Sequence, residues 1–234
     1  MNPSWTGREA LLAATGHHFL ARFSPGPGHD VVGYQDNGTV VWTTGTIANS
    51  LGDPLLAAAI GAGLTGLTFL DLPRQSADEA ARLFPSARRD DWEIRWTTEP
   101  APARDLESEI VPLGAPHHSA INELLDEALP YTGNRPGDSR IRNWYGIFAS
   151  DRLVAVGAER SRHDVGYLAA IAVAPGYQGR GFGAAVTTAI TRLLLREFDI
   201  CLLGVMDHNA RAKAAFRHMG YRDRLLRTAI RFDR

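Results

Sequence analysis

The sequence predicts a mixed α/β protein of α+β type, built from two successive α/β segments of which the first is the smaller. Apolar stretches of strand length alternate with amphipathic helical stretches along most of the chain. A proline-rich step at residues 99–102 interrupts this alternation, and we place a domain boundary there, between residues 1–103 and 104–234. With 234 residues, the chain is long enough for two domains that each have a core.

The first segment carries two clear local signals. Asn37-Gly38 is a strong signal for a hairpin turn, and Ser76 with Glu79 three residues later marks the start of a helix. From these signals and from hydrophobic periodicity, strands are predicted at residues 31–34, 39–43, 64–72 and 92–97, and helices at residues 11–20, 55–60 and 76–84.

The second segment continues the same alternation with a tight turn around Asp151 and a helix-ending glycine at Gly220. Strands are predicted at residues 109–113, 144–148, 153–158, 167–173, 200–206 and 226–232, and helices at residues 116–129, from residue 184 onward, and at residues 210–218.

The amino-acid composition argues against several classes of protein. Hydrophobic residues make up 44% and charged residues 22%, which is typical of a folded protein, and the net charge of −1 gives no basic field for nucleic acid. The single cysteine, Cys201, excludes a disulfide framework and predicts a core thiol rather than a nucleophile. The start of the chain has no apolar run, so we expect a cytoplasmic protein without a membrane partner, as a monomer or homodimer. The pairs His17-His18 and His117-His118 lack further ligands, and no metal site is predicted.

A glycine-rich loop, Gln178 to Gly183, separates a predicted strand from a predicted helix. Glycines let backbone N–H groups approach a ligand closely, and a helix N-terminus attracts anions, most often phosphate. A Walker A loop is excluded because no Gly-Lys-Ser/Thr follows. The dinucleotide pattern is formally met by Gly179, Gly181 and Ala184, but five residues, 174–178, separate the strand from Gly179, and Asp199 precedes the next strand instead of ending it.

Residues 171–183 closely resemble the strand, proline and Q/R-x-x-G-x-G/A signature of the GNAT acyltransferase superfamily, with Gln178, Gly181 and Gly183 on the signature positions. Residues 207–221 are similar to the family's second cofactor segment, an Asn followed by a helix that ends in Gly-aromatic. The resemblance covers about residues 107–234. It implies a mostly antiparallel sheet that splays between its fourth and fifth strands, with acetyl-CoA in the gap. One interpretation of residues 1–103 is a degenerate GNAT-like half.

The resemblance also implies a set of cofactor contacts. Backbone groups of the fourth strand would bind the pantetheine arm, N–H groups of the loop would bind the pyrophosphate, and Arg180 would add a charge-assisted contact. The implied cofactor-binding residues are Ile171, Ala172, Val173, Gln178, Gly179, Arg180, Gly181, Phe182, Gly183, Ala184, Asn209 and Phe216.

The proton path departs from the family pattern. A substrate amine must lose a proton before it attacks the thioester, but Tyr167 stands where family members often have a Glu base, and Phe216 stands where they have a Tyr acid. Glu159, His163 and Tyr167 are the catalytic candidates, with Asp164 nearby and water as a further proton source for the thiolate.

The predicted function is acetyl-CoA-dependent N-acetylation of an amine on a small molecule or peptide. The acceptor pocket is expected to include the loop at residues 131–140. The alternative is a non-catalytic acyl-CoA-binding module, motivated by the residues at positions 167 and 216. A third possibility, a nicotinamide dinucleotide oxidoreductase, is separated from both by testing NAD against coenzyme A.

Overall fold

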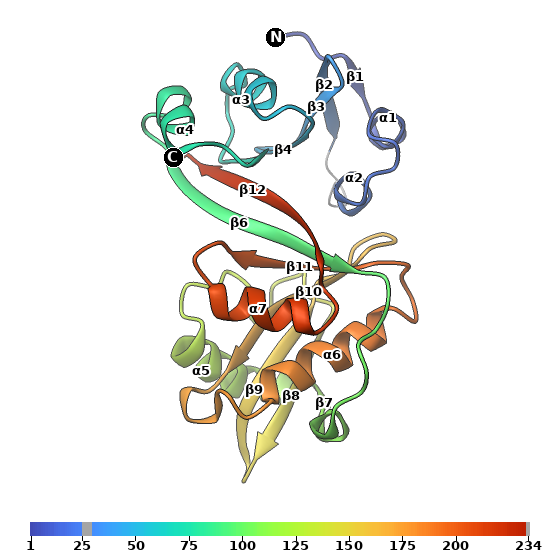
Figure 1. Ribbon diagram of the computed structural model, residues 1–234, viewed down its shortest axis with the longest axis vertical. Helices are drawn as coiled ribbons and strands as arrows, with labels where there is room; N and C mark the ends of the chain where they lie inside the picture. Colours follow the sequence, from blue (N-terminus) through green and yellow to red (C-terminus); the bar gives the residue numbers. More distant parts are fainter. Residues whose placement is uncertain (25–29, 233–234) are drawn as a thin grey trace. The chain divides into compact units, whose positions relative to one another are not determined.

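The computed structural model describes residues 1–24 and 30–232, which fall into two compact units (Figure 1). The first comprises the described parts of Met1–Ile94, the segment Val205–Ala210 and the C-terminal stretch from Arg224. The second comprises Arg95–Gly204 and Arg211–Asp223. Contacts thus divide the chain near residue 94 and return its last strand to the first unit, whereas the two continuous domains inferred from the sequence stay a prediction.

The first unit is a mixed sheet with helices. Its helices are α1 (Arg8–Ala14), α2 (Phe19–Phe23), α3 (Pro54–Ala62) and α4 (Ala77–Leu83). Its strands are β1 (Trp5–Thr6), β2 (Val31–Asp36), β3 (Thr39–Thr44), β4 (Ile47–Leu51), β5 (Phe69–Pro73) and most of β6 (Arg88–Thr97) and β12 (Asp223–Arg231). The strand order runs β1-β2-β3-β4-β5-β12, antiparallel except for the parallel pair β4–β5. Apolar residues of α3, α4 and the central strands form its core.

Local signals in this unit correspond to observed turns and caps. Asn37 lies at the β2–β3 turn with a positive φ of 41°, and the Ser76 hydroxyl accepts a hydrogen bond from the Glu79 N–H at 3.1 Å. The single helix predicted at residues 11–20 is wrong, because the backbone turns at Gly16 and His17, both with positive φ, and separates α1 from α2. β1 and β4 were not predicted from the sequence.

The second unit is a mostly antiparallel sheet covered on both faces by helices (Figure 1). Its strands are β7 (Val111–Leu113), β8 (Asn143–Ala149), β9 (Arg152–Glu159), β10 (Gly166–Val173) and most of β11 (Cys201–Met206), in the order β11-β10-β9-β8-β7. Its helices are α5 (His118–Ala128), α6 (Phe182–Leu194) and α7 (Ala210–His218), and a short 3₁₀ turn, Pro175–Tyr177, precedes α6. Only β10 and β11 pair in parallel within this order. The mixed α/β fold with a mostly antiparallel sheet is therefore confirmed.

Alternation along β9 assigns the two faces of this sheet. Val156 and Ala158 pack in the core cluster that contains the buried face of α5. Gly157 points the other way, and a Cβ there would lie 2.7 Å from side-chain atoms of Val186 and Ile190 of α6. The glycine is thus required for the close approach of α6, and α5 and α6 lie on opposite faces.

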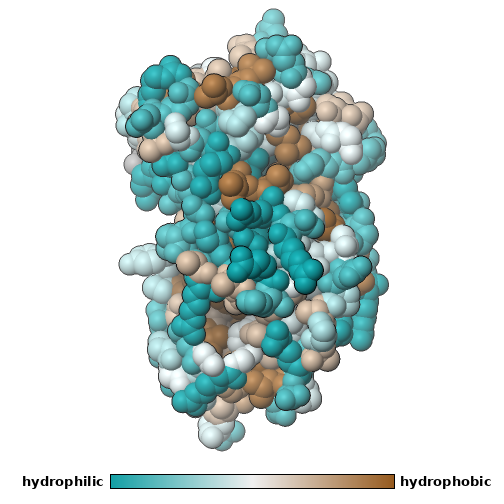
Figure 2. Space-filling model, viewed as in Figure 1, coloured by the Kyte–Doolittle hydropathy of each residue, from teal (hydrophilic) through white to brown (hydrophobic). Residues whose placement is uncertain are grey.

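The surface shown in Figure 2 is mainly hydrophilic, with hydrophobic residues in small separate patches. In the parts of the chain that the structure describes, no helix combines the length and the apolar character needed to cross a bilayer.

Candidate functional site

The pairing between β10 and β11 ends partway along β10. Their parallel pairing covers Gly166 to Leu168 of β10 against Cys201 to Leu203 of β11, whereas β10 continues to Val173 and stays paired with β9. The second half of β10 therefore has one edge that β11 does not pair. An unpaired strand edge offers backbone N–H and C=O groups in a row, which is the pattern that an extended ligand can complete.

A β-bulge lies within this open stretch. Ala169 pairs with Ala158 and Ala172 pairs with Val156, so two residues of β10 face the single residue Gly157 of β9. Ala170, inside the bulge, has a positive φ of 49°, which is rare for a residue with a Cβ. Bulges redirect backbone groups and occur often beside active sites. Ala170 is not among the residues predicted from the sequence, because an Ala-rich strand carries no signal for a bulge.

The glycine loop leads from β10 into the N-terminus of α6. Gly179 and Gly181 have φ values of 79° and 90°, in the left-handed region that glycine adopts without strain, and Gly181 is the N-cap of α6. α6 begins at Phe182, two residues before the predicted start. In an α-helix the first N–H groups have no intrahelical acceptor, so those of Phe182 to Ala184 are available for an anion at the positive end of the helix dipole.

Side chains hold this loop against β10. The Gln178 amide donates from Nε2 to the Val173 carbonyl at 3.1 Å and accepts at Oε1 from Nη1 of Arg211 at 3.3 Å. The Val173 carbonyl is thus already bonded, which leaves its N–H for the predicted ligand contact. A Cβ on Gly183 would lie 3.2 Å from the Val173 side chain, so α6 starts directly against β10.

Two cations lie beside the loop. The guanidinium of Arg180 lies over the Tyr177 ring at 5.4 Å, and Arg211 enters from the first turn of α7. Both side chains belong to exposed residues. Arg211 is not among the cofactor-binding residues predicted from the sequence, although its position in the first turn after Asn209 is a usable signal.

The second predicted cofactor segment divides between the units. Asn209, whose N–H donates to the Met206 carbonyl at 3.0 Å, belongs to the first unit, so the second unit holds the glycine loop without it. Phe216 of α7 is buried and meets the Tyr221 ring edge-on, with 6.2 Å between the ring centroids. Phe216 is therefore a core residue of the second unit.

The three catalytic candidates do not form a cluster. Glu159 is buried, its carboxylate lies 3.1 Å from a guanidinium nitrogen of Arg142, and it accepts from the Asn143 amide at 2.7 Å. By strand alternation it points to the α6 face, whereas Tyr167 packs against the core on the α5 face. His163 is exposed in the β9–β10 turn with a φ of 52°. Of the three, Tyr167 and Glu159 lie nearest to the bulge along the strands.

Cys201 is a core thiol. It is fully buried in β11, its sulfur lies 3.2 Å from the Tyr221 hydroxyl, and burial raises its pKa to about 12. The raised pKa keeps the thiol protonated at neutral pH, and only the thiolate reacts rapidly.

We therefore expect native protein to resist a disulfide reagent at pH 8. Absorbance of the released thiolate should show no reaction over minutes, and one equivalent should react once guanidinium chloride unfolds the chain. Rapid stoichiometric labelling of the folded protein would contradict this assignment.

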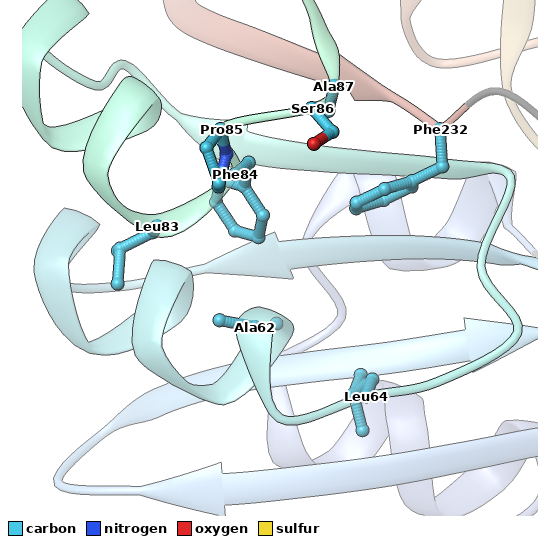
Figure 3. Close-up of a pocket in the computed structure, with 9 residues that line it drawn as sticks. Ala62, Leu64, Leu83, Phe84, Pro85, Ser86, Ala87 and Phe232 are labelled. Atoms are coloured by element: carbon cyan, nitrogen blue, oxygen red, sulfur yellow. The ribbon is translucent and has the colours of Figure 1, made fainter.

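A separate pocket lies wholly within the first unit (Figure 3). Its volume is about 390 Å³, and the rings of Phe84 and Phe232 line it together with Leu64 and Leu83. None of its lining residues is ionisable, and none is a predicted site residue. Within residues 1–24 and 30–232, no group of three or more His, Cys, Asp or Glu residues is arranged to hold a metal ion.

Comparison with known proteins agrees with this architecture. The family model described as FR47-like protein matches residues 144–230. A structure from Novosphingobium aromaticivorans, described as a GNAT-family acetyltransferase, is 18% identical, with 95% of this chain and 97% of that chain covered and a TM-score of 0.59. A Drosophila protein is 17% identical over 97% of this chain and 86% of that chain, with a TM-score of 0.62. A GCN5-related N-acetyltransferase from Sphaerobacter thermophilus is 16% identical over 82% and 79%, with a TM-score of 0.53.

At these identities the solved structures establish the fold. A search among curated proteins finds no significant match. The FR47-like match runs from Trp144 in β8 to Ile230 in β12, so it includes the open edge of β10 and the glycine loop. The chain therefore has the fold of solved structures described as GNAT-family acetyltransferases, and its residues 144–230 match the FR47-like family model.

Proposed function

We propose that the protein is an acetyl-CoA-dependent N-acetyltransferase that modifies an amine on a small molecule or peptide. The observation that carries the proposal is the open edge of β10, which follows the separation from β11 and continues through the 3₁₀ turn Pro175–Tyr177 into the glycine loop. An extended pantetheine arm suits the strand edge, and a pyrophosphate suits the N-terminus of a 13-residue helix.

In this proposal, different groups of the protein bind the pyrophosphate, orient the acyl end and remove the proton. N–H groups of Gly181 to Ala184 bind the pyrophosphate, and Arg180 and Arg211 add charge beside them. Backbone groups of the β10 bulge lie where the open edge begins and orient the acyl end. Bound acetyl-CoA would supply the activated acyl group. Proton removal from the amine falls to a side chain near the bulge or to water.

Titration calorimetry with coenzyme A and with NAD tests the cofactor, and a thiol-release assay with acetyl-CoA and a panel of amines tests the chemistry. We expect coenzyme A to bind, NAD to give no heat, and at least one amine to accelerate thiol release above hydrolysis. Binding of NAD in place of coenzyme A would exclude the proposal.

A second candidate function is a non-catalytic acyl-CoA-binding module. It is favoured by the contacts that the Glu159 carboxylate makes with Arg142 and Asn143. The Arg142 guanidinium pairs with this carboxylate at 3.1 Å and the Asn143 amide donates to its Oε2, so its charge is already stabilised, which makes it a weaker acceptor for a proton from an amine, although Oε1 accepts no hydrogen bond from the described residues. Coenzyme A binding without thiol release across the whole amine panel would favour this module over the enzyme.

Tyr167 is the candidate whose hydroxyl can be tested with the least disturbance. Tyr167→Phe keeps the ring that packs on the α5 face and removes only the hydroxyl. If the hydroxyl transfers or orients a proton, kcat should fall about tenfold or more while the Kd for coenzyme A stays the same. Steady-state kinetics with calorimetry measures both, and an unchanged kcat would remove Tyr167 from the proton path.

A further inference from the structure

A partly buried arginine, Arg160, lies directly beside Tyr167. The Arg160 N–H donates to the Tyr167 carbonyl at 2.8 Å, so the two residues face each other across β9 and β10, and alternation places both side chains on the α5 face. The Arg160 Nε is buried and has no hydrogen-bond partner among the described residues. A buried guanidinium donor without an acceptor costs free energy, and such groups are normally satisfied by a partner or ligand.

Two further arginines lie in the same region. Arg140 forms a bidentate pair with Asp138, with nitrogen–oxygen distances of 2.9 and 2.7 Å, and Arg162 lies on the hairpin beyond Arg160. The segment that carries Arg140 is attached to the end of β9 by the Arg142 N–H, which donates to the Glu159 carbonyl at 2.8 Å. Burial lowers the pKa of Arg162, and charge repulsion from Arg160 and Arg140 lowers it further. The three guanidinium groups are therefore close enough to interact electrostatically.

The three arginines lie beside two features that were predicted to face the acceptor amine. Tyr167 occupies the strand position at which the resemblance places a base close to the substrate amine. The loop at residues 131–140, predicted to line the acceptor pocket, carries Asp138 and Arg140. Burial lowers the pKa of Arg160 and Tyr167 interacts with it electrostatically, which agrees with a cation set into the site rather than exposed on the surface.

We propose that Arg160, with Arg140 and Arg162 beside it, binds an anionic group on the acceptor, so that the substrate is an amine that also carries a carboxylate or a phosphate. This inference rests on the proposed acetyl transfer for the role of the bound molecule as acceptor, whereas the anion site itself rests on the arginines alone. A guanidinium binds both carboxylate and phosphate through paired N–H donors, so the shared chemistry is a multi-oxygen anion.

Direct binding is tested by NMR of the arginine Nε–Hε groups in protein saturated with coenzyme A. The Arg160 resonance is identified by its loss in Arg160→Lys, and inorganic phosphate and acetate are titrated separately. We expect saturable movement of this resonance with at least one anion, and the stronger response identifies phosphate or carboxylate as the preferred group. The resonance of Arg196, an exposed arginine after α6 identified by its loss in Arg196→Gln, is the matched control. No saturable movement at Arg160, or equal movement at Arg196, would overturn the anion site.

Kinetics test the acceptor class with paired amines that differ by the anionic group: alanine against ethylamine, and O-phosphoethanolamine against ethanolamine. We expect kcat/KM to be about tenfold or more higher for an anion-bearing amine than for its uncharged partner. Arg160→Gln should remove most of that difference through KM, Arg160→Lys should restore part of it, and Arg196→Gln should retain it. Equal acetylation of both members of each pair would refute the acceptor class while leaving acetyl transfer intact. Saturable anion binding with no turnover of any amine would refute acetyl transfer while supporting the anion site.

Discussion

Gly181→Glu is expected to weaken coenzyme A binding by about 100-fold or more. Gly181 is the N-cap of α6 with a φ of 90°, so a side chain there strains the backbone, and a carboxylate at the positive end of the helix occupies the place of the phosphate. The Glu carboxylate and the pyrophosphate would both lie at the N-terminus of α6, and two negative charges at such close range repel each other strongly. Titration calorimetry of the folded variant measures the loss.

Gly181→Ala is the matched control for backbone strain. A Cβ at this position would meet only the Leu106 side chain, at 3.8 Å, so alanine adds the left-handed strain without charge or crowding. Its Kd should change by about tenfold at most. Circular dichroism and thermal unfolding should show both variants folded, and a Gly181→Glu protein with wild-type affinity would exclude this loop as the pyrophosphate site.

Asp71→Ala is expected to lower the free energy of unfolding by about 3–5 kcal/mol, the largest stability effect that we predict. Asp71 and Arg227 form a buried pair in the first unit, with side chains 4% and 1% exposed and a nitrogen–oxygen distance of 2.7 Å. The Trp92 indole N–H also donates to this carboxylate at 3.2 Å. Removing the carboxylate leaves the Arg227 charge buried without its partner. Chemical denaturation of wild type and variant measures the difference.

An exposed pair in the same unit is the control. Arg231 and Asp90 lie 2.9 Å apart with side chains 49% and 41% exposed, so Asp90→Ala should cost about 1 kcal/mol or less. Burial raises the pKa of Asp71 even though Arg227 opposes the rise, which indicates that desolvation outweighs the attraction between the two charges. The double variant Asp71→Leu with Arg227→Met should therefore be more stable than Asp71→Ala alone. Equal costs for Asp71→Ala and Asp90→Ala would contradict this account.

Elements with strong local signals were predictable from the sequence. The Asn37-Gly38 hairpin and the Ser76 cap depend on backbone preferences of a few consecutive residues, and both were placed correctly. β4 was not predicted because its sequence contains Asn49 and Ser50 in place of an apolar alternation. Its buried Ser50 is instead satisfied by donating to the Asp71 carbonyl at 2.8 Å, a partner that only the folded sheet provides.

The sequence by itself determined the glycine loop and its resemblance to the GNAT signature, because the loop's requirements are local: glycines at alternate positions, a preceding strand and a following helix. Tertiary structure decided how the strands part after Leu168, where the bulge at Ala170 lies and which candidates share a face. It also paired Arg227 with Asp71, 156 residues away, and placed Arg160 beside Tyr167. Such arrangements follow from strand register and side-chain alternation, which a shift of one residue would reverse, so residue types alone do not fix them.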